Sequence, residues 1–306
     1  MRILIAGGHG FVGKNLTKAL EDSPHEVSAL SRRDGFDLSN LEITKKYLAD
    51  LKPDVLFNCA AHGGSLHYVT AYAADVLNDN SLMTLNLYKA VKEVCPQAHI
   101  VNPLSNCSYP GDADVHSEPE WWDGEVHPSV FSYGNAKRFV YVTSHCYKKQ
   151  GNIRTSNFLV PNTFGPGDHL DPNKTHALNG MIIRMIQAHR QKMPEFEIWG
   201  TGSPIREWAY IDDVVAVMKD CLNLDQDLSY PVNIAQNHGF SIKESAQMIA
   251  KAVGYEGKLT FNPSYQDGAP KKILDNKNFR KLFPDFKFMD HQEGIRRTVQ
   301  YYESAL

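Results

Sequence analysis

Tyr133 and Lys137 stand four positions apart in the segment from Ser132 to Lys137. Side chains with this spacing lie one turn apart on the same face of a helix. An ammonium group beside a phenol stabilises the phenolate, so we expect Lys137 to lower the pKa of Tyr133 from about 10 toward neutrality. The pair therefore predicts a general acid that transfers a proton at a carbinol or ketone oxygen.

A glycine motif, Gly7-x-x-Gly10-x-x-Gly13, occupies the first predicted junction between a strand and a helix. Its first interval is one residue longer than in the common dinucleotide fingerprint. Glycines at such a junction permit a tight turn and bring the backbone close to a pyrophosphate at the helix N-terminus. An isolated motif of this kind can be a simple turn, but its place at the first junction favours a dinucleotide site formed by Gly7, Gly10, Phe11, Val12 and Gly13.

The second predicted strand ends in Ser31, Arg32 and Arg33. An acidic residue there would bind a ribose 2′-hydroxyl and favour NAD, whereas two guanidinium groups suit a 2′-phosphate. Asp34 comes too late in the segment to change this. We therefore expect NADP(H), bound by Ser31, Arg32 and Arg33, the alternative being a solvated pair of surface arginines.

Two further pairs of residues are candidates for the cofactor site. Asp37 and Leu38 are placed at the adenine edge, and Ala60 and Ala61 end the strand that should pass under the dinucleotide. Small side chains there let a ligand approach the backbone. Ordinary core packing explains the two alanines equally well.

Ser105 lies in the loop of residues 103–110, after another predicted strand. A hydroxyl at this place would complete a site with Tyr133 and Lys137. A single serine is usually an ordinary loop residue, but the three residue types behind a nucleotide-binding turn form a specific combination.

Composition limits the possible partners. The 306 residues carry a formal charge of −3 and contain no run of lysine or arginine, so we expect no nucleic-acid partner. The five cysteines are an odd number without metal-ligand spacing, which predicts reduced thiols and no metal site. No stretch of about 18 apolar residues and no signal-peptide core occur, so we expect a cytoplasmic protein with no membrane partner.

Apolar runs alternate with helix-spaced patterns through the first half of the chain. Helices are predicted at residues 12–20 and 44–51 and around Tyr133. Strands are predicted at residues 1–6, 26–30, 54–59, 99–101 and 155–160. This alternation predicts an α/β protein with a Rossmann-type doubly wound parallel sheet and right-handed crossovers.

Beyond Pro161 the sequence becomes rich in turn residues, and this change marks the expected boundary between two lobes. Later segments predict a helix at 176–190, a strand at 232–235 and a helix at 241–253 that begins with a capping box. We expect an NADP(H)-binding Rossmann domain over residues 1–165, to which 208–238 return. A smaller discontinuous α/β substrate lobe would comprise residues 166–207 and 239–306.

These segments together resemble the extended short-chain dehydrogenase/reductases that act on nucleotide sugars, and within them the GDP-L-fucose synthases. Beyond the glycine turn, the Ser105 loop and the Tyr133–Lys137 pair, the resemblance extends over residues 60–64, 162–166, 199–207, 210–213 and 267–272. Enzymes of that family epimerise C3 and C5 of GDP-4-keto-6-deoxymannose and reduce C4 with NADPH. The resemblance implies a nucleotide-diphosphate sugar substrate and a homodimer built by the helices around residues 82–94 and 133–148.

By position in the family's motifs, the epimerisation pair falls on Cys107 and His176. A C4 ketone acidifies the neighbouring carbons because Tyr133 and Ser105 can stabilise the enolate; a thiolate then abstracts a proton from one face and an imidazole returns one to the other. A lone cysteine is otherwise a small buried residue, and a lone histidine a surface residue at a helix start. The same matching implies that the substrate contacts Asn162, Arg184, Trp199, Arg206 and Lys272.

Three segments depart from the GDP-L-fucose synthase pattern. The family has Ser-Ser-Cys and Tyr-Gly-Pro where this chain has residues 105–107 and 164–166, and the segment 118–128 also differs from that subgroup. The alternatives are a C4 reductase without epimerisation, a redox-neutral nucleotide-sugar epimerase with tightly bound NAD(P), and a non-enzymatic dinucleotide sensor.

Overall fold

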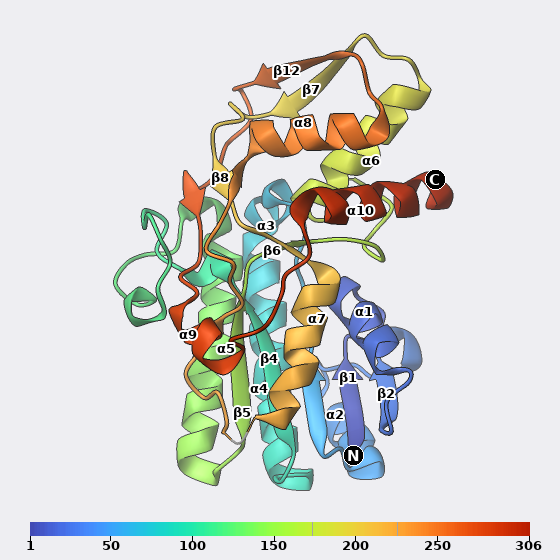
Figure 1. The fold of residues 1–306 in the computed structure, drawn as a ribbon. Helices are drawn as coiled ribbons and strands as arrows, with labels where there is room; N and C mark the ends of the chain where they lie inside the picture. The colour runs from blue at the N-terminus through green and yellow to red at the C-terminus, as the bar shows by residue number, and fades with distance from the viewer. Residues whose placement is uncertain (173, 225) are drawn as a thin grey trace.

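The computed structural model describes residues 1–172, 174–224 and 226–306, and its centre is a parallel sheet of six strands (Figure 1). The strand order is β10-β5-β4-β3-β1-β2. The bounds are β1 (Arg2–Ala6), β2 (Glu26–Leu30), β3 (Val55–Asn58), β4 (His99–Ser105), β5 (Thr155–Val160) and β10 (Val232–Asn233). From β1 the chain adds β2 on one side and β3 on the other, so the order reverses at β1, where ligands of such sheets bind. The predicted Rossmann-type fold is confirmed.

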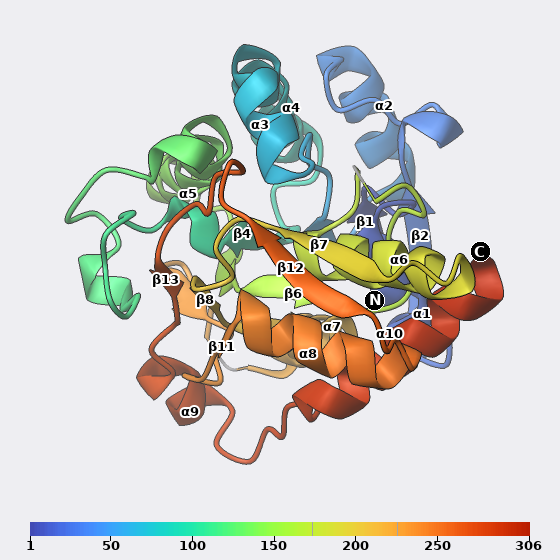
Figure 2. The same ribbon diagram turned by 90° about the horizontal axis from the view of Figure 1, so that it is seen from above.

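Helices cover both faces of this sheet, as Figure 2 shows from above. One face carries α1 (Phe11–Leu20) and α7 (Ile211–Asp220), and the other carries α2 (Leu41–Leu51), α4 (Ala73–Val94) and α5 (Phe131–Gly151). Successive side chains of a strand point to opposite faces, so even a continuous apolar run such as β1 supplies two cores.

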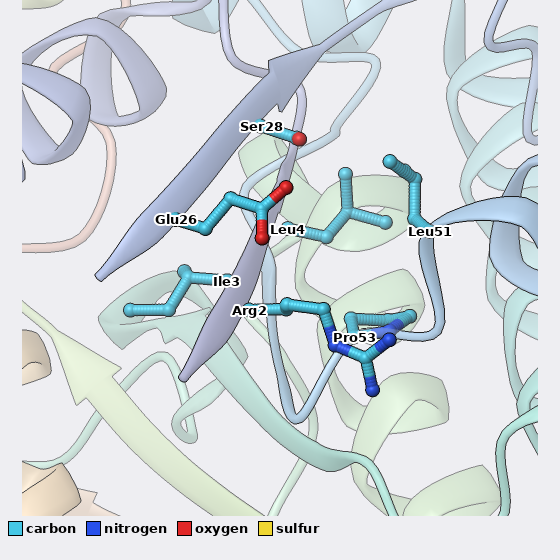
Figure 3. A pocket seen from close by; sticks show the side chains of 7 residues that line it. All are labelled: Arg2, Ile3, Leu4, Glu26, Ser28, Leu51 and Pro53. Carbon is cyan, nitrogen blue, oxygen red and sulfur yellow. The ribbon is translucent and has the colours of Figure 1, made fainter.

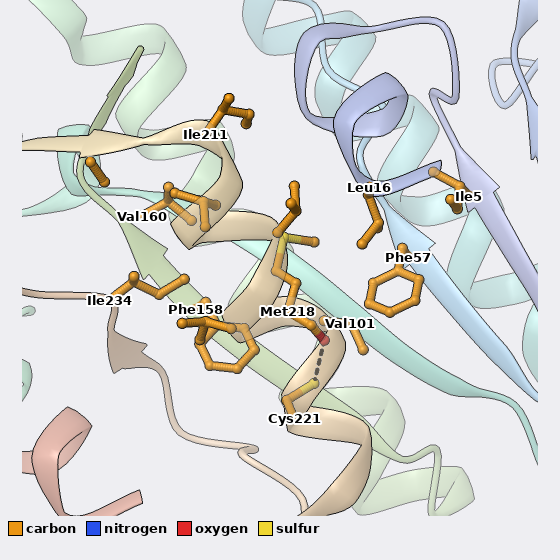
Figure 4. Packing of buried hydrophobic residues seen from close by; sticks show 14 of the residues in the cluster. Ile5, Leu16, Phe57, Val101, Phe158, Val160, Ile211, Met218, Cys221 and Ile234 are labelled. Atoms are coloured by element: carbon orange, nitrogen blue, oxygen red, sulfur yellow. Dashed lines mark hydrogen bonds between the residues drawn. The ribbon is translucent and has the colours of Figure 1, made fainter. Parts of the chain in front are cut away.

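The core between the sheet and α7 illustrates this division (Figure 4). Ile3 and Ile5 of β1 pack there with Phe57 and Met218, whereas Leu4 lies in the separate core beneath α2 and α4. Burial of both faces holds the sheet rigid, and its carboxyl edge is the platform for the site.

Further elements lie beyond the carboxyl ends of the strands (Figure 1). A second apolar core joins α6 (Ala177–Arg190), β7 (Glu195–Trp199), α8 (Ile242–Val253) and α10 (His291–Ala305), with β12 (Lys258–Asn262) paired to β7. Two small sheets connect these elements to the central one. They contain β8 (Ile205–Arg206), β11 (Phe240–Ser241) and β13 (Lys271–Lys272) in one, and β6 (Asn162–Phe164) and β9 (Trp208–Tyr210) in the other. The remaining helices are α3 (Leu66–Ala71) and α9 (Lys277–Leu282).

The capping box predicted for α8 is present. Ser241 Oγ accepts a hydrogen bond from the backbone N–H of Glu244 at 3.1 Å, and Glu244 Oε2 accepts one from the backbone N–H of Ser241 at 2.8 Å. The exchange satisfies donors that the first helical turn leaves free.

The strand predicted at residues 99–101 was too short, because β4 continues through Pro103 to Ser105. Beyond Val101 this strand pairs with β5 alone. A proline, which lacks an N–H donor, is tolerated there because the β3 side needs no donor. The longer strand carries Ser105 to the carboxyl edge of the sheet.

Candidate functional site

The Tyr133–Lys137 pair lies on α5, at the carboxyl edge of the sheet. Lys137 Nζ is 5.5 Å from the centre of the Tyr133 ring and donates a hydrogen bond to the backbone oxygen of Pro103 at 3.2 Å. Burial lowers the pKa of Lys137 to about 8. The structure thus brings the lysine beside the phenol from the next turn of the helix, as the spacing predicted.

The expected direction of the Tyr133 pKa was wrong. Burial of the phenol, with a smaller contribution from nearby Cys107, raises the pKa of Tyr133 above its usual value. Lys137 stands over the ring, and the loss of solvation outweighs its charge. A phenol with a raised pKa keeps its proton at neutral pH, which is the state that a general acid requires.

A loop of residues 60–64 fixes the position of the Tyr133 ring, and sequence reasoning did not assign it this role. A Cβ on Gly63 would lie 3.1 Å from Cε2 of Tyr133, so only glycine leaves the ring its full space. His62 anchors the loop to α4: its backbone N–H donates to Asn80 Oδ1 at 2.9 Å, and its Nδ1 is 2.8 Å from Asp79 Oδ2. In the sequence, this role could have been inferred from the small residues on both sides of His62 in the segment 60–64.

Ser105 and Cys107 come together at the end of β4. The backbone N–H of Cys107 donates to Ser105 Oγ at 3.2 Å, which caps the short turn Asn106–Ser108. Lys272 Nζ, from β13, lies 3.4 Å from Cys107 Sγ. Burial alone would raise the pKa of the thiol, but Lys272 and the Ser105 hydroxyl hold the pKa of Cys107 below its usual value.

His176 immediately precedes α6, and its ring lies against the start of α1. Its Nδ1 is 2.8 Å from Asp168 Oδ2, and its ring centre is 5.1 Å from that of Phe11. The side chain is 53% exposed. The contacts described for His176 are with Asp168 and with Phe11 at the start of α1, whereas those of Cys107 are with Ser105 and Lys272.

Asp168 is a residue that sequence reasoning treated only as part of a turn. Its Oδ2 accepts hydrogen bonds from the hydroxyl of Thr175, from the backbone N–H of His176 at 2.9 Å and from Asn179 Nδ2 at 3.1 Å. Burial opposes the charged form, but the hydrogen bonds from His176 and Thr175 hold the pKa of Asp168 far below its usual range. A carboxylate on Nδ1 orients the imidazole and leaves Nε2 for chemistry. In the sequence, Asp168 could have been recognised as an acidic residue shortly before the candidate His176.

The glycine turn fits a dinucleotide pyrophosphate. Gly10 is the N-cap of α1, no side chain caps that end among the described residues, and the first turn contains no acidic residue. Gly7 has φ 81°, and a Cβ there would lie 2.6 Å from the backbone nitrogen of Ala60. Free N–H groups at a helix N-terminus, with the backbone open to close approach, are suited to an anion.

The turn after β2 leaves two guanidinium groups available. Asp34 Oδ2 accepts from the backbone N–H of Ser31 at 2.8 Å and lies 2.9 Å from His9 Nε2; the His9 contact is the main cause that lowers the pKa of Asp34. The Asp34 carboxylate therefore interacts with Ser31 and His9 of its own surroundings and not with Arg32 or Arg33. Arg32 and Arg33 are exposed and have no ion-pair partner among the residues described, which fits a 2′-phosphate.

The other residues expected at the cofactor site differ in how far they are buried. Asp37 is half-buried, and its Oδ1 accepts from the backbone N–H of Ser39 at 3.0 Å. The Leu38 side chain is buried in the core beneath α2, where it continues the apolar packing around α2 and β1; its contact with adenine stays a prediction. Ala60 lies against the glycine turn, and Ala61 is exposed beside it.

The residues expected to contact substrate fall into two groups. The Arg184 guanidinium lies 4.1 Å from the Trp199 ring centre, and Trp199 stacks on Tyr265 with 5.1 Å between ring centres. Both aromatic rings are exposed. Tyr265 was not identified from the sequence, which gave no signal for a single aromatic residue in a loop. This group forms an open aromatic and cationic surface.

The second group lies deeper. Arg206 is buried, donates from Nη2 to the backbone oxygen of Asp267 at 3.1 Å, and has a pKa that burial lowers to about 10. Lys272 is its neighbour in register on β13. Asn162 Nδ2 donates to the backbone oxygen of Glu207 at 3.2 Å. Arg206 and Lys272 thus converge, while Arg184 stands apart with Trp199.

A shallow pocket at the opposite end of the sheet is not this site. It is lined by Arg2, Ile3, Leu4, Glu26, Ser28, Leu51 and Pro53 (Figure 3). These residues mark the amino-terminal ends of β1 and β2, whereas open parallel sheets bind ligands at the carboxyl ends. In the described parts of the chain, no group of three or more His, Cys, Asp or Glu is arranged to hold a metal ion, and no helix is long and apolar enough to cross a membrane.

Comparisons with known proteins agree with this geometry. A curated protein of Drosophila melanogaster, named "Probable GDP-L-fucose synthase", is 32% identical over 315 residues, covering 98% of this chain and 97% of that protein. A crystal structure of a GDP-L-fucose synthetase from Naegleria fowleri bound to NADP has a TM-score of 0.89 at 23% identity, over 99% of this chain and 94% of that one. A GDP-mannoheptose C4 reductase from Campylobacter jejuni with NADP bound has a TM-score of 0.86 at 23% identity, over 99% and 98%.

The predicted resemblance to enzymes of nucleotide-sugar metabolism is confirmed by these relatives. A family model matches residues 3–235, a region that contains the glycine turn, the Ser105 loop and the Tyr133–Lys137 pair. This chain belongs to the NAD dependent epimerase/dehydratase family.

Proposed function

We propose that this protein is an NADPH-dependent enzyme that reduces C4 of a GDP-linked 4-keto-6-deoxy sugar and also epimerises C3 and C5. The observation that carries the proposal is the placement of Tyr133, Lys137, Ser105 and Cys107 at the sheet edge that also presents the glycine turn. The name of the Drosophila relative supports the substrate class, and the NADP bound to the Naegleria structure supports the cofactor.

Reduction requires a proton donor at the C4 oxygen. NADPH, when bound, supplies the hydride for C4. Tyr133, which burial keeps protonated, gives its proton to the developing alkoxide, and the Ser105 hydroxyl donates a hydrogen bond to the same oxygen. Lys137 stands beside the ring and stabilises the phenolate that the transfer leaves.

Epimerisation requires a base and an acid on opposite faces of the sugar. Cys107 takes a proton from a carbon next to the ketone, and His176 returns one to the other face. Asp168 accepts from Nδ1 of His176, so Nε2 is the nitrogen that delivers the proton. Tyr133 and Ser105 stabilise the enolate between the two steps.

The nucleoside diphosphate would lie between the two lobes that we expected from the sequence. Arg206 and Lys272 face the sugar end, and Arg184 and Trp199 offer charge and an aromatic surface at the nucleotide end. Asn162, from β6, donates to the backbone oxygen of Glu207, the residue that follows Arg206.

The test is a panel of GDP-, dTDP-, CDP- and UDP-linked 4-keto-6-deoxy sugars in deuterated buffer. We expect one NADPH oxidised per sugar converted, with the GDP-linked sugar preferred and deuterium at C3 and C5. No NADPH oxidation with any sugar would refute reductase activity. Conversion without net NADPH oxidation would indicate a redox-neutral epimerase.

A C4 reductase without epimerisation is the second candidate, and the fold shared with the Campylobacter C4 reductase favours it. Cys107→Ser separates the two functions. We expect this variant to stop incorporation of deuterium at C3 and C5 while it still reduces C4, because serine is a far weaker base than a thiolate. Cys146→Ser, at an exposed cysteine of α5, is the control. If wild-type product carries no deuterium, the protein is a plain C4 reductase.

We also propose a homodimer built by α4 and α5. These helices pack against each other on one face of the sheet. They expose large apolar side chains, Leu77 and Leu85 on α4 and Phe131 and Val142 on α5. Contiguous exposed apolar side chains are typical of an interface between subunits.

A further inference from the structure

A lysine and a cysteine separated by 165 positions meet in this structure. Lys272 Nζ is 3.4 Å from Cys107 Sγ, a distance at which an ammonium donates a hydrogen bond to sulfur. Lys272 is only 7% exposed, and Cys107 is half-buried. From the resemblance we expected Lys272 to contact the substrate, and in the structure its ammonium lies against the thiol.

Strand geometry aims Lys272 at this place. In β13, Lys272 stands opposite Arg206 of the parallel strand β8. The backbone N–H of Glu207 donates to the backbone oxygen of Lys272 at 2.9 Å and fixes the register. Side chains alternate along a strand, so Lys271 points to the other face. The direction of Lys272 is therefore set by the backbone rather than by a flexible loop.

The local charge balance requires an anion. Within the described residues, Lys272 forms no ion pair with a carboxylate. A buried ammonium is costly unless an opposite charge compensates it. Cys107 is the group in contact with Lys272 that can supply a negative charge.

The other buried cysteines show what burial does without such a cation. Burial is the largest cause that raises the pKa of Cys95 and of Cys221 to about 12, and no cation among the described residues acts on either thiol. Burial also opposes ionisation of Cys107, but the contacts with Lys272, Ser105 and Arg206 reverse the direction and hold its pKa below the usual value. The difference among the three thiols follows the neighbouring cation and not the degree of burial.

The remaining titratable groups around this contact do not cancel the cation. From α5, Tyr133 has a raised pKa and stays neutral, and Lys137 adds a further positive charge. Burial and the nearby cations lower the pKa of His116 to about 3 and also lower that of His127. Both imidazoles are therefore neutral at neutral pH, and the buried Arg206 guanidinium is a further positive charge that lowers the pKa of Cys107.

We propose that Lys272 is a positioning residue that holds Cys107 as a thiolate before substrate binds. The thiol proton goes to solvent in the free protein. The thiolate can then take a proton from a carbon next to the ketone and become a thiol, with no prior transfer to another base. Only the use of this thiolate rests on the proposed function; its existence does not.

The test measures the ionisation of Cys107 without substrate or cofactor. The rate of iodoacetamide alkylation at Cys107 is followed against pH by peptide mass spectrometry. We expect the midpoint in wild type to lie below that of free cysteine, about 8.5. Lys272→Met should slow alkylation near neutral pH about tenfold and move the midpoint upward by about one unit, whereas Lys272→Arg should retain the low midpoint.

Three controls keep the result clear. Lys271→Met changes the adjacent lysine on the other face and should leave the midpoint unchanged. Exposed Cys146 provides a reference in every sample, and the ultraviolet absorbance of the thiolate, compared with Cys107→Ser, gives a second measure. Equal midpoints in wild type and Lys272→Met overturn the proposal. If Lys272→Met does not fold, a wild-type midpoint at or above that of Cys146 overturns it.

The outcome is independent of the enzymatic activity. A low midpoint that depends on Lys272, in a protein whose product carries no deuterium at C3 or C5, would leave the thiolate established and remove only its role as a base. A midpoint that does not depend on Lys272, in a protein that exchanges deuterium, would refute this inference and leave the epimerase intact.

Discussion

The protonation states of single residues at this site depend on burial and on contacts with neighbouring cations. The Tyr133 phenol keeps its proton because solvation is lost, although Lys137 stands beside the ring. The Cys107 thiol tends to lose its proton although it is also buried, because Lys272 touches the sulfur. Tyr133 thus remains an acid with Lys137 5.5 Å from its ring centre, whereas Cys107 becomes a base because Lys272 lies in hydrogen-bond contact with its sulfur at 3.4 Å.

At the scale of single residues, we predict the effect of removing the Tyr133 hydroxyl. Tyr133→Phe should reduce NADPH-dependent reduction of the 4-keto sugar by about 10²- to 10⁴-fold, the usual contribution of a general acid. Binding of NADPH, measured by calorimetry, should change little because the ring remains. Tyr147→Phe, which removes a hydroxyl farther along α5, is the control. Full activity in Tyr133→Phe would contradict the assignment.

At the scale of elements, one carboxylate, that of Asp168, holds the segment that leads into α6 against the first turn of this helix. Asp168 collects hydrogen bonds from Thr175, His176 and Asn179, so it joins the loop to the first turn of the helix. Acceptance of a backbone N–H at a helix start stabilises the helix, and the bond to Nδ1 orients the His176 ring. The element and the catalytic candidate are therefore fixed by the same group.

Asp168→Asn should weaken this segment. Since the folded pKa of Asp168 is depressed, its contribution to stability is present above about pH 4, the unfolded pKa, and is lost as pH falls below that value. We expect the variant to lose about 1 to 3 kcal/mol in the free energy of unfolding at neutral pH, with the difference shrinking in acid.

Urea unfolding at a series of pH values checks this expectation. Asp114→Asn, at an exposed carboxylate of another loop, is the matched control. A difference between wild type and Asp168→Asn that stays constant from neutral pH into acid would show that the charge of Asp168 contributes nothing.

For the whole molecule, Glu207 ties together segments that are distant in sequence. This fully buried side chain accepts hydrogen bonds from the backbone N–H groups of Gln236 at 2.6 Å and Leu274 at 2.8 Å. Burial raises the pKa of Glu207 to about 7. The chain that follows β10 and the chain that follows β13 are thereby held at one carboxyl group beside Arg206.

Glu207→Gln should change how stability depends on pH. A carboxyl with a raised folded pKa stabilises the protein fully below its unfolded pKa and loses that contribution as pH rises through the folded value, here from about 4.5 to about 7. The stability of wild type relative to Glu207→Gln should therefore fall by about 3 kcal/mol over this interval. Chemical unfolding measures it, with the exposed Glu256→Gln as control. A difference that is constant with pH would contradict the raised pKa.

The proposed dimer is also a property of the whole molecule. A charge placed in an apolar interface is desolvated, and in a two-fold interface it occurs twice. Leu85→Glu and Val142→Glu should each weaken self-association by about 30-fold or more, measured by sedimentation velocity. Met193→Glu, at an exposed apolar residue outside α4 and α5, should have no effect. A wild-type protein that is monomeric at micromolar concentration would refute the dimer.

The sequence by itself determined the features that depend on local geometry. The strands at residues 26–30 and 155–160, the glycine turn before α1 and the one-turn spacing of Tyr133 and Lys137 follow from side-chain periodicity and backbone conformation, which are set within a few residues. The resemblance to nucleotide-sugar enzymes likewise follows from short segments, among them the glycine turn and the Tyr133–Lys137 pair.

Only the tertiary structure decided which distant groups meet and how far each is buried. It placed Lys272 on Cys107, the ring of His176 against Phe11 and the Leu38 side chain in the core. It also set the direction of the Tyr133 pKa. These outcomes depend on packing across long sequence separations, and the balance between lost solvation and nearby charge can be evaluated only where the neighbours are known.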